Sequence, residues 1–252
     1  MYELELNVTD TFQMAKLEQW SCAVYQLEQK VQAVFASVQA WRGWKHFHDP
    51  SSPDEALIAT MREVLRSVCW YQARTTEAGF HMIGRLPKSE VRLMQQLACH
   101  KAEEAEHGLW ARKDYVALGG NLRELEETIA PAAFSVAAVW WWMAQNEDPY
   151  GYLGAEYLFE QLTAEVTKAL LPVIQRRNLP KIGFRFVIEH ATEDAKHATF
   201  LRHLIKDVAA RQPESVPAML RCFDYFAHVY PLPLWDEAFA RANDWRGAII
   251  VP

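Results

Sequence analysis

Two stretches of this 252-residue chain repeat one pattern, HKAEEAEH at residues 100–107 and HATEDAKH at residues 190–197. Each stretch has His at its first and eighth positions and a carboxylate, Glu104 or Asp194, at its fifth. With about 3.6 residues per turn, these three positions fall within an arc of about 60° on a helix. Each stretch is therefore expected to be helical and to present two imidazoles and one carboxylate on one face.

The rest of the chain also has the pattern of helices. Apolar residues recur at three- and four-residue intervals from Phe12 to Ala40, and the segment WRGWKHFHDPSSPDE (41–55), with its Gly and Pro residues, is expected to be a break. Further helices are predicted over residues 55–84, 90–118, 131–146, 151–177, 183–211, 214–230 and 233–244. No alternating strand pattern of useful length appears after the first eight residues, so we predict one all-α domain over residues 1–252.

Composition excludes several classes of protein. The net charge of −6 argues against a nucleic-acid surface, since phosphate binding needs clustered Lys and Arg. Four Cys without a CxxC pair indicate a reducing compartment, and the start MYELELNVTD lacks the pattern of a signal peptide. The uncharged stretch from Ile129 to Ala144 is shorter than the roughly 20 residues of a membrane span, so it is expected to be a buried helix. We therefore expect a cytoplasmic protein without nucleic-acid or membrane partners.

The two repeats predict a metal site. Each contains a carboxylate-x-x-His pair, as the helices of di-iron carboxylate bundles do, and counting along the two predicted helical hairpins places Glu77 near Glu104 and Glu160 near Asp194. Glu156, one turn before Glu160, is the alternative to Glu77. Oxygen and imidazole ligands together suit iron or manganese. The predicted set holds four carboxylates and three imidazoles: Glu77, Glu104, His107, Glu160, His190, Asp194 and His197.

Ordinary ion pairs along solvated helix faces are the competing interpretation. They account for the charged residues between the repeat positions, which are Lys101, Glu103, Glu106, Glu193 and Lys196. They do not account for His100, Glu104 and His107, which share a face with Leu93 and Leu97. Polar groups on a face that packs into the core need a partner, and a metal ion provides one.

At these residues the chain resembles the haem-oxygenase-like di-iron oxidases and oxygenases. The resemblance rests on GAEYLFE (154–160), on FxFxxxHxxxDxxH (184–197) and on the segment from Glu104 to Gly119. It implies a haem-oxygenase-like seven-helix bundle that holds two Fe(II) ions in its core and uses O2 as co-substrate. Carried over to this chain, Glu77, Glu104 and His107 would bind one iron and His190, Asp194 and His197 the other, with Glu160 shared or nearby. His100 departs from the family pattern, and we expect it to support the site rather than to bind iron.

The resemblance also implies the type of reaction. Such proteins activate O2 through a peroxide that bridges the two irons, and they N-oxygenate amines or cleave and rearrange C–C and C–N bonds. We predict a small amine- or carboxylate-bearing substrate, an amino acid or a derivative of one. One of the three tryptophans at 140–142 is expected to face the substrate cavity. Four cationic residues could bind a substrate carboxylate, although a position on the surface is the more ordinary interpretation of each. The residues concerned are Trp140, Trp141, Trp142 and Met143 for the wall, and Arg74, Arg85, Arg112 and Lys113 for the anchor. An external electron donor and a homodimer are compatible with this prediction.

Four alternatives remain at this stage. A ferritin-like di-iron N-oxygenase has the same order of ligands, and a fatty-acid decarboxylating oxidase belongs to the same family. A non-catalytic iron-binding protein of this fold is the third. The fourth is a metal-free thiaminase-like enzyme, which would have no use for the ligands. An ordinary haem oxygenase needs a proximal His near its N-terminus, and His46 and His48 lie in the predicted break instead.

Overall fold

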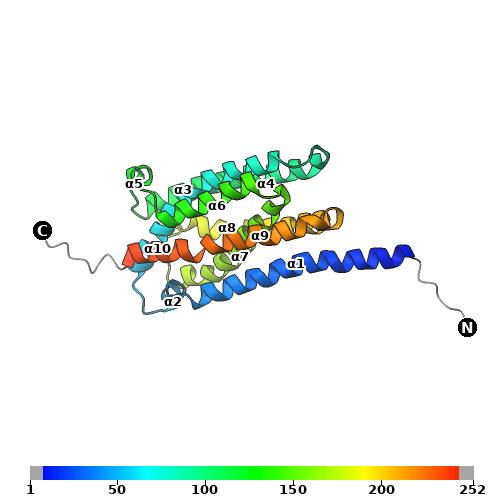
Figure 1. The fold of residues 1–252 in the computed structure, drawn as a ribbon. Helices are drawn as coiled ribbons and strands as arrows, with labels where there is room; N and C mark the ends of the chain where they lie inside the picture. Colours follow the sequence, from blue (N-terminus) through cyan, green and yellow to red (C-terminus); the bar gives the residue numbers. More distant parts are fainter. Residues whose placement is uncertain (1–7, 244–252) are drawn as a thin grey trace, which may run out of the picture.

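The structure, a computed structural model, describes residues 8–243 and is built from helices throughout (Figure 1). Residues 1–7 and 244–252 lie outside the described residues. The first range holds most of the stretch tested for a signal peptide, and the second begins with the last residue of the final predicted helix. No strand occurs between residues 8 and 243, which confirms the prediction of an all-α fold. The helices are α1 (Val8–Ala40), α2 (Arg42–His48), α3 (Asp54–Gly84), α4 (Val91–Ala117), α5 (Leu122–Glu127), α6 (Pro131–Asn146), α7 (Tyr152–Arg176), α8 (Arg185–Arg211), α9 (Val216–Val229) and α10 (Leu232–Asn243), with short 3-10 turns at residues 88–90, 149–151 and 213–215.

The long helices lie side by side in one bundle (Figure 1). Helices α3 and α4 form one hairpin and α7 and α8 form another, as the sequence predicts. Helix α4 packs against α8, so the two hairpins meet along the helices that carry the repeats. Helices α6 and α10 pack on α3, and α9 and α1 pack on α7. The repeats therefore face each other across the interior.

Two short helices lie where the sequence analysis expected none. Helix α2 occupies residues 42–48 of the predicted break, and its Phe47 is buried in the core. A Gly within a helix costs only about 1 kcal/mol, so Gly43 does not prevent α2, and the break begins only ahead of Pro50. Helix α5 follows the turn at Gly119, and the side chain of Asn121 caps it by accepting a hydrogen bond from the backbone N–H of Arg123.

The uncharged segment became α6, with one buried and one exposed face. Trp140 and Met143 are buried, whereas Phe134 and Trp142 are about half exposed. Among the described residues, no helix combines the length and the hydropathy that crossing a bilayer requires. The prediction of a buried helix is thus correct for one face of α6.

Helices α7 and α9 approach each other closely at Gly154. A Cβ atom at this position would collide with the backbone carbonyl of Met219 on α9, which cannot move away as a flexible side chain could. Gly154 therefore sets the distance between α9 and the helix that carries Glu160.

We predict that Gly154→Ala lowers the free energy of unfolding by about 3 kcal/mol, because the added methyl group forces the two backbones apart. Gly84→Ala is the matched control, since a Cβ there meets no atom within 4 Å. Its free energy of unfolding should stay unchanged or rise by up to about 1 kcal/mol. Urea unfolding followed by circular dichroism measures both variants, and equal stability of the two would contradict this account of the helix contact.

Candidate metal centre

Seven buried side chains of the type that binds metals converge where α4, α7 and α8 meet. Helix α4 contributes three of them, α7 one and α8 three, and each is at most 8% exposed. Three are carboxylates and four are imidazoles. The residues are His100, Glu104, His107, Glu160, His190, Asp194 and His197.

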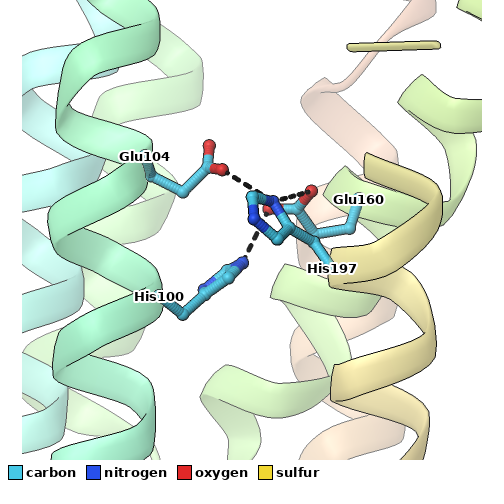
Figure 2. Close-up of side chains that lie close together, drawn as sticks. All are labelled: His100, Glu104, Glu160 and His197. Carbon is cyan, nitrogen blue, oxygen red and sulfur yellow. Dashed lines mark ion pairs between the residues drawn. The ribbon is translucent and has the colours of Figure 1, made fainter. Parts of the chain in front are cut away.

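The first group consists of His100, Glu104, Glu160 and His197, whose ligand atoms all lie within 4.8 Å of one another. Figure 2 shows the four side chains pointing toward one another, two from α4 and two from α7 and α8. His100 Nε2 lies 3.2 Å from Glu160 Oε1. His197 Nδ1 lies 3.1 Å from Glu104 Oε1 and 3.5 Å from Glu160 Oε2. One cation at the middle of this group could contact all four side chains.

The second group consists of His107, His190 and Asp194, whose ligand atoms also lie within 4.8 Å of one another. The rings of His107 and His190 have their centroids 4.4 Å apart. Glu104 connects the two groups, because its Oε2 lies 3.1 Å from His107 Nδ1 while its Oε1 faces His197. Its two oxygen atoms are thus placed to serve neighbouring cations.

The orientation of His190 suits a metal ligand. Its Nδ1 lies 2.6 Å from the carbonyl oxygen of Phe186, so Nδ1–H donates the hydrogen bond and Nε2 is left as the acceptor. Burial and the nearby charge of His107 lower the pKa of His190 to about 4, which keeps the imidazole neutral. A neutral imidazole is the form that coordinates a cation.

The site is short of positive charge. Burial, together with Glu160 and Glu104, raises the pKa of Asp194 well above its usual value. Burial opposes protonation of His197, but the carboxylates of Glu104 and Glu160 beside its Nδ1 outweigh it and raise the pKa of His197 to about 11. Several buried nitrogen and oxygen atoms of the two groups also lack a hydrogen-bond partner; they belong to His100, Glu104, His107, Glu160, Asp194 and His197. Unsatisfied buried atoms of this kind are what a bound cation would satisfy, so the residues fit a metal centre.

Six of the seven predicted site residues come together, and Glu77 does not. Its side chain is exposed on α3. Gln72 faces the site instead, and its Nε2 donates a hydrogen bond to the backbone carbonyl of Glu104 over 3.2 Å. Residue 77 lies about 140° further around the helix axis from Gln72. Counting along a hairpin predicts depth but not direction, so the placement of Glu77 at the site was wrong.

His100 is the residue whose position the sequence analysis undervalued. It was expected to support the site from outside, whereas its Nε2 lies within the first group. The signal was present in the sequence, because His100 occupies the same place in its repeat as His190 does in the other. Metal binding by His100 belongs to the proposal below.

Glu156, the alternative to Glu77, is paired with a cation of the chain itself. Glu156 is fully buried, and Lys101 Nζ donates a hydrogen bond to its Oε1. Burial disfavours the charged ammonium group, but Glu156 and Glu104 outweigh it and raise the pKa of Lys101. The same oxygen lies 3.9 Å from His100 Nδ1. The buried ion pair therefore borders the first group without adding net charge to it.

An apolar cavity reaches the second group from the other side. It is lined by α3 from Thr60 to Tyr71, by α7 from Phe159 to Leu170, and by His190 of α8. The cavity volume is about 80 Å³. Each of these segments has twelve residues, so its ends lie about 16 Å apart along the helix axis. No Lys, Arg, Asp or Glu among the described residues lines this cavity.

The expected pocket residues lie elsewhere. Trp140 is buried beside Lys101, Trp141 packs on His81, and Trp142 packs on Tyr225. None of the three lines the apolar cavity. The cationic candidates for a substrate carboxylate, Arg74, Arg85, Arg112 and Lys113, are exposed and do not line it either.

We predict that Lys101→Met lowers the free energy of unfolding by about 3–5 kcal/mol, because it leaves the buried carboxylate of Glu156 without its counter-charge. The double variant Lys101→Met/Glu156→Gln should recover most of this loss, since both charges are then removed. Urea unfolding of the metal-free protein measures both. Equal stability of the single and the double variant would contradict a structural role for this ion pair.

Comparison with known proteins agrees with this fold. The sequence pattern of a family described as "iron-containing redox enzyme" matches residues 62–230. Among solved structures, a domain of unknown function with a haem-oxygenase-like fold from Shewanella denitrificans is similar, with a TM-score of 0.73 and 22% identity over 88% of this chain and 94% of that one. A TenA homologue from Pseudomonas syringae pv. tomato has a TM-score of 0.66 and 15% identity, over 88% of this chain and 93% of that one.

These two likenesses show the fold, which confirms the predicted haem-oxygenase-like bundle. A search of curated proteins finds no match. The family pattern spans more than half of the chain and includes all seven residues of the two groups. The protein therefore belongs to the family of iron-containing redox enzymes.

Proposed function

We propose that the protein is a non-haem oxidoreductase that uses O2 and two Fe(II) ions. The observation that carries the proposal is the pair of adjoining, buried groups of potential metal ligands, which have too little positive charge to balance their carboxylates. The chain also belongs to a family of iron-containing redox enzymes. One ion would be held by His100, Glu104, Glu160 and His197, and the other by His107, His190 and Asp194. The bound iron would supply the reduction of O2 and the oxidising power for the substrate.

The residues of the chain perform three tasks in this proposal. The carbonyl of Phe186 orients His190, so that its Nε2 points away from that hydrogen bond. Glu104 lies between the groups and would keep the two ions close together. His190 lines the cavity, and the apolar walls of the cavity keep water away from this side of the site. Exclusion of water strengthens the electrostatic interactions within a site.

The shape and polarity of the cavity change the proposed substrate. An amino acid carries two charged groups, and the cavity offers no charged partner for the one remote from the metals. Tyr230 and Thr163 line the cavity with two hydroxyl groups 3.2 Å apart. Burial and the nearby charges of Asp194 and Glu160 raise the pKa of Tyr230. We propose a substrate with an apolar body in the cavity and a single amine or carboxylate group at the metal end. Such a substrate resembles a fatty acid more than an amino acid. The oxidation of a fatty acid is therefore favoured over that of an amino acid.

We predict two Fe(II) per chain in the wild-type protein and about one in Asp194→Ala and in His100→Ala, because each variant removes a ligand from one group. The matched control is Glu77→Gln, an exposed carboxylate on α3 that should leave two ions bound. The measurement is iron content after anaerobic loading and desalting. Less than one iron in the wild type would refute the proposal, and full occupancy of His100→Ala would return His100 to a supporting role.

We predict that decanoic acid and decylamine bind the iron-loaded protein with a negative heat-capacity change, because burying an apolar chain gives this sign. Val166→Phe, which adds bulk to the cavity wall, should weaken binding at least tenfold, whereas Val166→Ala should retain it. Anaerobic titration calorimetry measures both effects. Binding of arginine or glutamate, but of neither apolar compound, would support the amino-acid substrate instead.

A further inference from the structure

The face between α4 and α8 has a feature that the proposed function does not use. Two hollows open there, on either side of Glu103 and His197. Glu103 and Glu193 line both hollows, and Glu106 lines one. None of these three side chains belongs to the metal groups.

Imidazoles lie below these carboxylates. His100 lines one hollow and His107 lines the other, although these side chains are only 3% and 4% exposed. His100 Nε2 lies 3.2 Å from Glu160 Oε1 and His107 Nδ1 lies 3.1 Å from Glu104 Oε2, but neither contact has the geometry of a hydrogen bond. Two buried imidazoles whose ring nitrogens lack well-formed hydrogen bonds therefore line the hollows of an acidic surface.

The ring of His197 links the outside to the inside. Its Nε2 lies 3.3 Å from Oε2 of Glu103, whose side chain is 67% exposed. Its Nδ1 lies 3.1 Å from Oε1 of the buried Glu104. Moving inward, a cation would meet an exposed carboxylate, then an imidazole, and then a buried carboxylate.

The charge of this face suits a cation. Three carboxylates face one ammonium group, that of Lys196, which is paired with Glu193 at 2.9 Å. The carboxylates outnumber the cationic groups on this face, and their excess negative charge attracts divalent cations and repels anions. The apolar cavity, in contrast, approaches the site between α3 and α7 and contains none of these carboxylates.

We infer that the acidic mouth formed by Glu103, Glu106 and Glu193 is the entry route for the divalent metal, with Glu103 as the transient ligand that passes the ion to His197. The inference rests on the proposed function, since it requires that the two groups bind metal. In this role the acidic mouth determines how fast the metal ion enters, and it does not change the affinity of the two groups for the ion.

Trp110 offers a way to observe loading. Its ring stacks on His107, with the centroids 4.5 Å apart and the planes at 29°. A paramagnetic ion at His107 should quench its fluorescence. Trp110→Phe should remove this signal, and a metal-indicator dye should show unchanged uptake.

The experiment mixes the metal-free protein with Co(II) in a stopped-flow instrument at low and at high ionic strength. We compare the wild type with the mouth variant Glu103→Gln/Glu106→Gln/Glu193→Gln. The control variant Glu55→Gln/Glu127→Gln/Glu214→Gln removes three exposed carboxylates outside the mouth. At low salt the mouth variant should load about tenfold more slowly, the control within about twofold of the wild type, and high salt should reduce the difference. The final amount bound and the rate of release to a chelator should be equal in all three.

Several results would overturn the inference alone. If the wild type binds Co(II) and the mouth variant loads at the same rate, the mouth is not the route. Equal slowing in the control variant would show an effect of net charge rather than of position. Faster release with less metal bound would make Glu103 a resident ligand. A wild type that takes up no metal would overturn the proposed function as well.

Discussion

The burial of three carboxylates and four imidazoles at one point of a helical bundle is the constraint on which this structure depends. Charged groups in the interior are strongly destabilising unless opposite charge lies beside them. Beside the site, Lys101 provides a cation for the buried carboxylate of Glu156. For Glu104, Glu160 and Asp194, which face four imidazoles, the missing charge has to come from protons or from metal ions. The raised pKa values of Asp194 and His197 are the signs of that shortage.

The same constraint explains why the two sides of the site differ. A metal ion reaches the interior only by exchanging water for other polar ligands, and the face between α4 and α8 carries such ligands from the surface inward. A molecule with an apolar body gains free energy by leaving water, and the cavity between α3 and α7 is lined accordingly. His190 and Asp194 lie in the group nearer this cavity, whereas His100 and His197 border the acidic mouth. The site therefore lies between a polar and an apolar approach.

The helices that carry the site could be predicted because their signals are local. Apolar periodicity defined α3, α4, α6, α7 and α8 to within two residues at each end. The short α2 and α5 were missed, since six or seven residues give little periodicity, and burial of residues such as Phe47 helps to hold them in place. The sequence also predicted the cavity at the wrong helix. Three adjacent tryptophans drew attention to α6, while the space that reaches His190 lies between other helices.

The sequence by itself determined which side chains share a helix face. The spacing of His100, Glu104 and His107, and of His190, Asp194 and His197, places each triplet on one face, because the helical repeat depends only on the backbone. Only the tertiary structure decided which groups meet across helices. Each residue turns a helix by about 100°, so the rotation of α3 in its packing brings Gln72 rather than Glu77 to the site. The side chains between α4 and α7 likewise pair Lys101 with Glu156 and bring His100 to Glu160. Contacts between distant parts of the chain set the rotation of each helix about its axis, and the sequence of one helix does not show them.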